Sequence, residues 1–165
     1  MNRYAATLAA VTAVTLSLGA GALAAQNTLD TTLAVRSGAR LQVTNMSGRI
    51  TVRSWSRSQV RVQAEYDRAR IEVDDGPGRV SVRTTARRGD AEVDYTISVP
   101  TGTAVSLNGI STDASITGVC GEVDVNVVSG DVEVVCGQGD VSVQSVSGDV
   151  TVSDVRGTLN ASSTS

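Results

Sequence analysis

The sequence contains no histidine and no phenylalanine, and every one of its 14 basic residues is an arginine. The absence of histidine removes the most common general base and metal ligand near neutral pH. No aromatic residue follows Tyr95. Stacking sites for nucleic-acid bases and sugars need aromatic faces, so composition argues against a nucleic-acid-binding protein and gives no support to a carbohydrate-active enzyme.

No apolar run of membrane length follows residue 24, but one precedes it. Arg3 supplies a positive start, Ala5–Ala24 is uncharged and apolar, and Ala22-Leu23-Ala24 has the small-x-small pattern of a cleavage site. We therefore predict a secretory signal peptide at residues 1–25. The mature chain is then expected to be periplasmic or secreted in a bacterium and not to span a membrane.

Charge is divided unevenly along the chain. Residues 26–100 hold 12 Arg and 9 acids, a net charge of +3, whereas residues 101–165 hold one Arg and 8 acids, a net charge of −7. Such asymmetry indicates either two different partners or two halves that face each other.

A nine-residue repeat runs through residues 101–165. Glycine begins five successive units, at Gly121, Gly130, Gly139, Gly148 and Gly157. Apolar residues follow two and four positions later, as Val123 and Val125 do, and this alternation is typical of half-buried strands. Glycine supplies the unusual backbone angles of tight corners.

Alternate units resemble each other more closely than neighbours do. One corner recurs as Ser111-Thr112-Asp113, Ser129-Gly130-Asp131 and Ser147-Gly148-Asp149, and an amide recurs at Asn108, Asn126 and Gln144. The structural period is therefore 18 residues, with two strands and two corners per coil, and like residues should stack about 4.8 Å apart. We predict an all-β fold, a β-solenoid of nonapeptide half-coils.

Residues 26–100 form an irregular N-terminal region of short alternating runs separated by turn signals every 8–12 residues. They are expected to form distorted coils or a small sandwich, with Trp55 and Tyr66 as its large core residues. The regular solenoid of residues 101–165 stops where a further Gly-Asp corner is due, so we expect a chain truncated at its C-terminus.

The order of these parts resembles a known family. Asn45–Val52, Trp55 and Tyr95–Pro100, followed by repeated Ser-Gly-Asp-Val-x-Val, are similar to a bacterial domain-of-unknown-function family labelled "putative adhesin", and the match covers roughly residues 33–165. That family is similar to the head domain of auto-transporter adhesins. The resemblance implies an exported β-strand repeat protein without established enzymatic activity, and some relatives are linked to cell-envelope stress. Residues 136–138 depart from the repeat pattern.

The stacked Asp113, Asp131 and Asp149 are candidate calcium ligands, because calcium prefers several oxygen ligands. However, calcium-binding nonapeptide repeats use more glycines and a differently placed aspartate. The alternative, which we favour, is that serine and aspartate side chains bond backbone N–H groups at the turns.

Cys120 and Cys136 are the two cysteines, and an exported chain with an even number suggests a disulfide. In the 18-residue frame Gln138, not Cys136, stacks on Cys120, so the Cα separation approaches the limit of about 7 Å. A bridge and two unbridged thiols both remain open.

Arginines alternate with buried positions in the N-terminal region, at Arg49, Arg53, Arg61, Arg79 and Arg83. They could form a basic face for envelope phosphates or acidic polysaccharide. An ordinary solvated strand face is the alternative.

Taken together, the sequence predicts no enzyme and no cofactor. The first hypothesis is an exported adhesin-like or envelope-binding module, with envelope polysaccharide, lipid headgroups or a protein as its partner. The second is an accessory protein of the envelope-stress response. The third is a carbohydrate-active β-helix enzyme, whose two carboxylates would have to come from a repeating outer surface such as Asp131 and Glu133.

Overall fold

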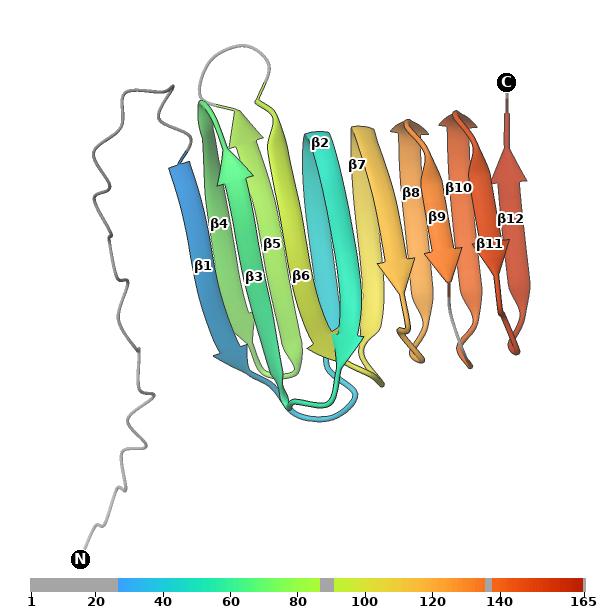
Figure 1. Cartoon of the computed structure of the whole chain (residues 1–165), viewed down its shortest axis with the longest axis horizontal. Helices are drawn as coiled ribbons and strands as arrows, with labels where there is room; N and C mark the ends of the chain where they lie inside the picture. The colour runs from blue at the N-terminus through green and yellow to red at the C-terminus, as the bar shows by residue number, and fades with distance from the viewer. Residues whose placement is uncertain (1–26, 87–90, 136–137, 165) are drawn as a thin grey trace, which may run out of the picture.

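The computed structural model describes residues 27–86, 91–135 and 138–164, and these residues form β-strands and no helix (Figure 1). The predicted all-β class is confirmed. No helix long and apolar enough to cross a membrane is found in the described ranges. The predicted signal peptide lies outside them.

The strands are β1 (Asn27–Ala34), β2 (Arg40–Trp55), β3 (Gln59–Tyr66), β4 (Ala69–Gly76), β5 (Arg79–Ala86), β6 (Val93–Pro100), β7 (Ala104–Thr117), β8 (Val123–Ser129), β9 (Val132–Val135), β10 (Val141–Ser147), β11 (Val150–Ser153) and β12 (Leu159–Ser163).

Strands of the repeat region pair in parallel at an 18-residue offset. In β8, Val123 lies opposite Val105 of β7 and Val141 of β10. In β9, Val132 lies opposite Ala114 of β7 and Val150 of β11. β8 and β9 are consecutive in sequence yet pair with other strands. Each strand therefore pairs with the strand 18 residues away, as the doubled repeat predicts.

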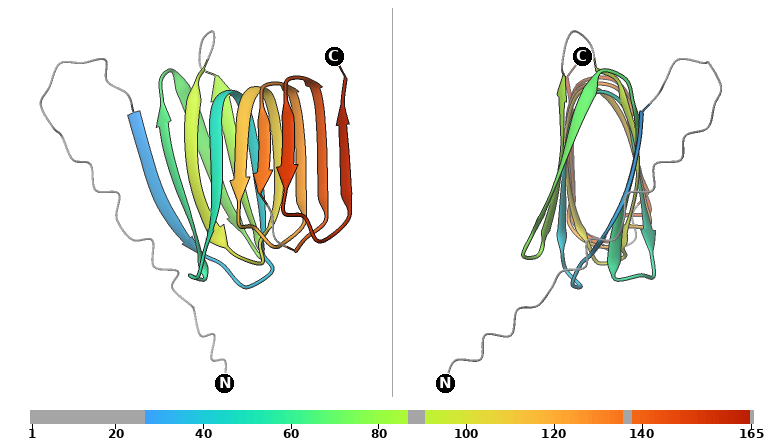
Figure 2. Two further views of the ribbon diagram at one scale, coloured as in Figure 1. Left: turned by 45° about the vertical axis from the view of Figure 1, so that its right-hand side comes forward. Right: turned by 90° about the vertical axis from the view of Figure 1, so that its left-hand side faces the viewer.

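The strands lie on two faces. Viewed along the long axis of the molecule, they outline a flattened oval (Figure 2). Face 1 contains β4, β5, β8, β10, β12 and the first halves of β2 and β7, because β5 pairs with residues 40–44 of β2. Face 2 contains β1, β3, β6, β9, β11 and the second halves of β2 and β7, because β6 pairs with residues 50–55 of β2.

The valines of the repeat point into the oval. Val123, Val125, Val132 and Val134 are each at most 1% exposed. Burying a valine side chain contributes roughly 1.5–3 kcal/mol, so stacking one level on the next stabilises both.

The expectation for the large core residues was wrong for Trp55. Trp55 lies at the end of β2, partly exposed, and its Nε1–H donates to the Gln59 carbonyl at 2.7 Å. An indole N–H needs a hydrogen-bond partner, and the first residue of β3 provides one. Tyr66 is partly buried against the core, whereas Tyr95 is the fully buried aromatic residue among those that the structure describes.

Glycine at the corners is required by the next level of the stack. A Cβ added at Gly139 would lie 1.9 Å from the carbonyl oxygen of Gly121, which precedes it by 18 residues. At Gly130 the added atom would lie 2.3 Å from the Thr112 carbonyl oxygen, and φ is +134°. The repeating glycine therefore permits close stacking of backbone on backbone.

The N-terminal region joins the same stack through β2. Residues Arg40–Arg53 of β2 pair in parallel with Ala104–Thr117 of β7, across both faces. β1, β3 and β6 then add antiparallel pairs on face 2, and β4 pairs antiparallel with β5 on face 1. This region therefore combines parallel pairs like those of the repeat, formed by β2 with β5 and β6, with antiparallel additions by β1, β3 and β4.

Candidate functional site

Outward side chains form rows along the long axis of the molecule, because the pairing offset is constant from level to level. The aspartate row is Asp113, Asp131 and Asp149 on face 2, and the pairing of β2 with β7 places Arg49 beside Asp113. The amide row is Asn108, Asn126 and Gln144 on face 1. Each row repeats one chemical group about every 4.8 Å.

The aspartates bond backbone one level away. Asp113 Oδ1 accepts the Asp131 N–H at 3.1 Å, and Asp131 Oδ1 accepts the Asp149 N–H at 3.1 Å. At the opposite corner Asp140 Oδ1 accepts the Thr158 N–H at 2.8 Å. Backbone N–H groups are the partners that the turn interpretation predicts, but they belong to the next level and not to the aspartate's own turn. A charge-assisted bond of this kind contributes more than a neutral one.

A shallow hollow of about 330 Å³ lies along the aspartate row. Arg49 lies at one end, and Glu133 and Thr151 contribute to the wall. In the described ranges, no three or more His, Cys, Asp or Glu side chains are grouped so that they could hold a metal ion. The row is thus a set of carboxylates spaced along a line.

The five candidate arginines do not share one surface. Arg49 and Arg53 of β2 and Arg61 of β3 lie on face 2. Arg79 and Arg83 of β5 lie on face 1, because they pair with the first half of β2. The single basic face considered from the sequence is therefore divided between two sides of the oval.

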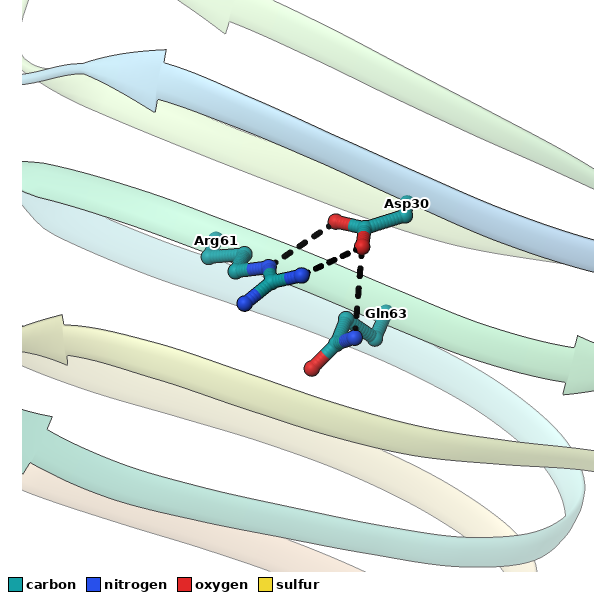
Figure 3. A network of polar contacts seen from close by, with 3 residues as sticks. All are labelled: Asp30, Arg61 and Gln63. Atoms are coloured by element: carbon teal, nitrogen blue, oxygen red, sulfur yellow. Dashed lines mark hydrogen bonds and ion pairs between the residues drawn. The ribbon is translucent and has the colours of Figure 1, made fainter. Parts of the chain in front are cut away.

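Arg61 is held by an acid of the neighbouring strand (Figure 3). Its Nε–H donates to Asp30 Oδ1 at 3.0 Å and its Nη2 donates to Oδ2, while Gln63 Nε2 donates to the same Oδ2 at 3.3 Å. The Arg61 guanidinium lowers the pKa of the Asp30 carboxyl, although partial burial opposes the shift. Arg61 is thus paired within the sheet.

Cys120 is partly buried, and its Sγ lies 3.8 Å from the Gly118 carbonyl oxygen. Cys136 lies outside the described residues, so the predicted pairing of the two cysteines stays a prediction.

Tyr95 places a polar group inside the N-terminal core. Its hydroxyl lies 2.6 Å from Thr84 Oγ1, which is also buried. Burial raises the pKa of Tyr95 to about 12, although the bond to Thr84 acts in the opposite direction. A phenol with a raised pKa stays neutral at physiological pH, so this pair is a structural contact.

A further row was missed by sequence reasoning. Four exposed apolar residues, which we call the apolar stripe, lie in register at the corner between the two faces: Met46, Ile110, Val128 and Val146. Each directly precedes a corner serine. That signal was available in the sequence, but the in–out alternation drew attention to the buried valines.

A second hollow, of about 390 Å³, borders the stripe on face 1. Val128 and Val146 of the stripe, the amide row and Gly109 all contribute to its lining. In the amide row, Asn126 Nδ2 donates to Asp124 Oδ1 at 3.1 Å. The corner therefore presents apolar, amide and carboxylate rows side by side.

The comparisons with known proteins give a loose structural likeness. No family model matches the chain, and no curated protein is significantly similar to it. A solved structure described as a putative cell adhesion protein from Clostridium sporogenes ATCC 15579 overlaps 84% of this chain and 100% of its own, with 7% sequence identity and a TM-score of 0.45. Because the sequence identity and the TM-score are both low, nothing that this neighbour binds is assigned to the present chain.

Proposed function

We propose that this chain is an exported, non-enzymatic β-solenoid that acts as an adhesin-like module and binds a component of the cell envelope. The observation that best supports this proposal is the set of rows of outward side chains, which keep a constant 18-residue register. A surface that offers the same group about every 4.8 Å suits an elongated partner that lies along the rows. Catalysis instead needs unlike groups converging on one reacting atom.

Export is tested by fractionating cells that express the full chain. We expect the protein in the periplasm or medium with its N-terminus near Gln26, as determined by intact-mass spectrometry. Full-length protein retaining Met1 in the cytoplasm would contradict export.

Envelope binding is tested by a pull-down from envelope fractions with the mature protein. The matched variant carries Asp131→Asn and Asp149→Asn, which remove charge from the aspartate row but keep an oxygen acceptor for the next level. Enrichment of one polysaccharide, lipid or protein by the wild type, and weaker enrichment by the variant, is the expected result. Equal retention by an unrelated acidic protein would refute specific binding.

The apolar stripe favours a second candidate, an accessory protein that acts through a protein partner. Half-exposed valines repeated along one line are unusual on a surface that needs only to be solvated. A pull-down dominated by one protein would support this candidate over polysaccharide adhesion.

A further inference from the structure

The apolar stripe is a continuous exposed feature. Met46, Ile110, Val128 and Val146 are 41%, 52%, 48% and 52% exposed. They are the outward apolar residues of four adjacent levels, so they span about 14 Å along the long axis of the molecule. Contiguous apolar surface rimmed by polar groups marks interaction sites more often than isolated apolar residues do.

The spacing of the stripe matches an α-helix better than an extended strand. The stripe residues are about 4.8 Å apart along the molecule, and a helix laid along the stripe presents one apolar turn about every 5.4 Å. Over the three steps of the stripe the helix is therefore displaced by about 2 Å. A strand in the same direction presents side chains on one face only about every 6.8 Å, so it is displaced by about 6 Å over the same three steps. An amphipathic helix places apolar residues in such a stripe.

The charges around the stripe indicate which charged residues a bound helix should carry beside its apolar side. Residues 101–165 carry a net charge of −7. Asp131 and Asp149 each follow a stripe valine by three residues, on the face 2 side, and Asp124 lies on the face 1 side beside Asn126. Partners with complementary charge associate faster and exclude partners of like charge. A helix bound here should therefore carry basic residues beside its apolar stripe.

We propose that the apolar stripe, with the amide-lined hollow beside it, is a docking site for a basic amphipathic helix of a protein partner. The proposal rests on the proposed binding function and names the class of partner for this corner. Apolar side chains of the helix pack on Val128 and Val146 and fill the hollow over Gly109. Its Lys or Arg side chains lie over the aspartate row.

The probes are three synthetic peptides of about 18 residues, long enough for helix formation. One has leucines at helical spacing with lysines elsewhere. The second has the same composition in scrambled order. The third keeps the leucine stripe but replaces lysine with glutamate. Binding to the mature protein is measured by fluorescence anisotropy, and the contact site is located by amide chemical-shift changes.

We expect the leucine–lysine helix to bind and to shift amides of β8 and β10, and the other two peptides to bind at least about ten-fold more weakly. The variant Val128→Ser with Val146→Ser should weaken binding about ten-fold. Leu159→Ser is the matched control, because Leu159 is 48% exposed but lies outside the stripe, and it should leave binding unchanged. The charge variant Asp131→Asn with Asp149→Asn should weaken binding and reduce its salt dependence.

Several outcomes overturn the proposal. Equal binding of the leucine–glutamate helix would exclude charge selection. Equal loss in the Leu159→Ser control, or shifts confined to residues outside the corner, would place binding elsewhere. If the wild type sediments as a dimer and the double valine variant as a monomer, a second copy covers the stripe. Envelope binding can persist when all peptides fail, so failure here is distinguishable from failure of the proposed function.

Discussion

The two halves of the molecule bury the same kind of residue but connect their strands differently. In the N-terminal region β4 and β5 are joined by Pro77-Gly78 and pair antiparallel. In the repeat region β8 and β9 are joined by Gly130-Asp131, an equally short link, and do not pair with each other. Strand alternation thus produces a buried side in both halves, and the link determines the topology.

The backbone angles of the two glycines account for that difference. Gly78 has φ +78° after a proline, which matches the third residue of a type II turn that reverses the chain. Gly130 has φ +134°, a region open essentially to glycine alone, and here the chain continues round the corner. One glycine in each two-residue link therefore gives a hairpin in the N-terminal region and a corner in the repeat region.

The largest expected effect separates these two glycines. Gly130→Ala should destabilise by about 3 kcal/mol or more, because strain adds to a clash with the Thr112 carbonyl oxygen. Gly78→Ala should cost roughly 1–2 kcal/mol, because nothing lies within 4 Å of its added Cβ. Urea unfolding of both variants measures the difference. Equal losses would show that stacking does not restrict the corner.

Alkaline pH should affect the two halves differently, because the described residues beyond Pro100 contain no tyrosine. The folded pKa of Tyr95 is raised to about 12 from an ordinary value of 10.0. The stabilising contribution is therefore present below pH 10 and is lost as pH rises toward 12, by up to about 2–3 kcal/mol. Urea unfolding at a series of alkaline pH values should show this loss in the wild type. It should be absent in Tyr95→Phe, and an unchanged loss in the variant would assign it to another group.

A smaller effect is expected at the aspartate row. Asp131→Ala removes the acceptor for the Asp149 N–H and should cost about 1 kcal/mol. Asp131→Asn keeps an oxygen acceptor and should cost less. Thermal unfolding of the two variants compares them, and an equal loss of stability for asparagine and alanine would show that the charge and not the backbone bond stabilises the row.

The smallest effect is expected at the exposed ion pair of the N-terminal region. Asp30→Asn should cost no more than about 1 kcal/mol, because exposed pairs are screened by solvent. The lowered pKa of Asp30 means that its contribution is present above the ordinary value of 3.8 and is lost as pH falls through the folded value. NMR titration of Asp30 in wild type and Arg61→Gln should show a lower pKa in the wild type. Identical values would contradict the assigned cause.

The repeat region was more predictable than the N-terminal region. Identical corner residues recur every 18 positions, so sequence alone indicated which valines stack, and Val123 and Val141 do pair. In the N-terminal region the strands could be recognised, but their partners depend on links of different lengths. The crossing of β2 from face 1 to face 2 separates Arg79 from Arg49, and spacing along the chain does not reveal that separation.

Among the candidate sites, sequence located the aspartate row but not its partners, which lie one level away. The apolar stripe was not predicted because the residue type alone does not distinguish an outward valine from an inward one. Its outward orientation continues the in–out alternation of the strand, in which Val127 is buried and Val128 is exposed.

The central claim is parallel stacking at an 18-residue offset, and backbone nuclear Overhauser effects test it most directly. The account predicts inter-strand contacts between Asn126 and Gln144 and between Ser115 and Glu133. Antiparallel contacts between β8 and β9 across Gly130-Asp131, as in a hairpin, would contradict it.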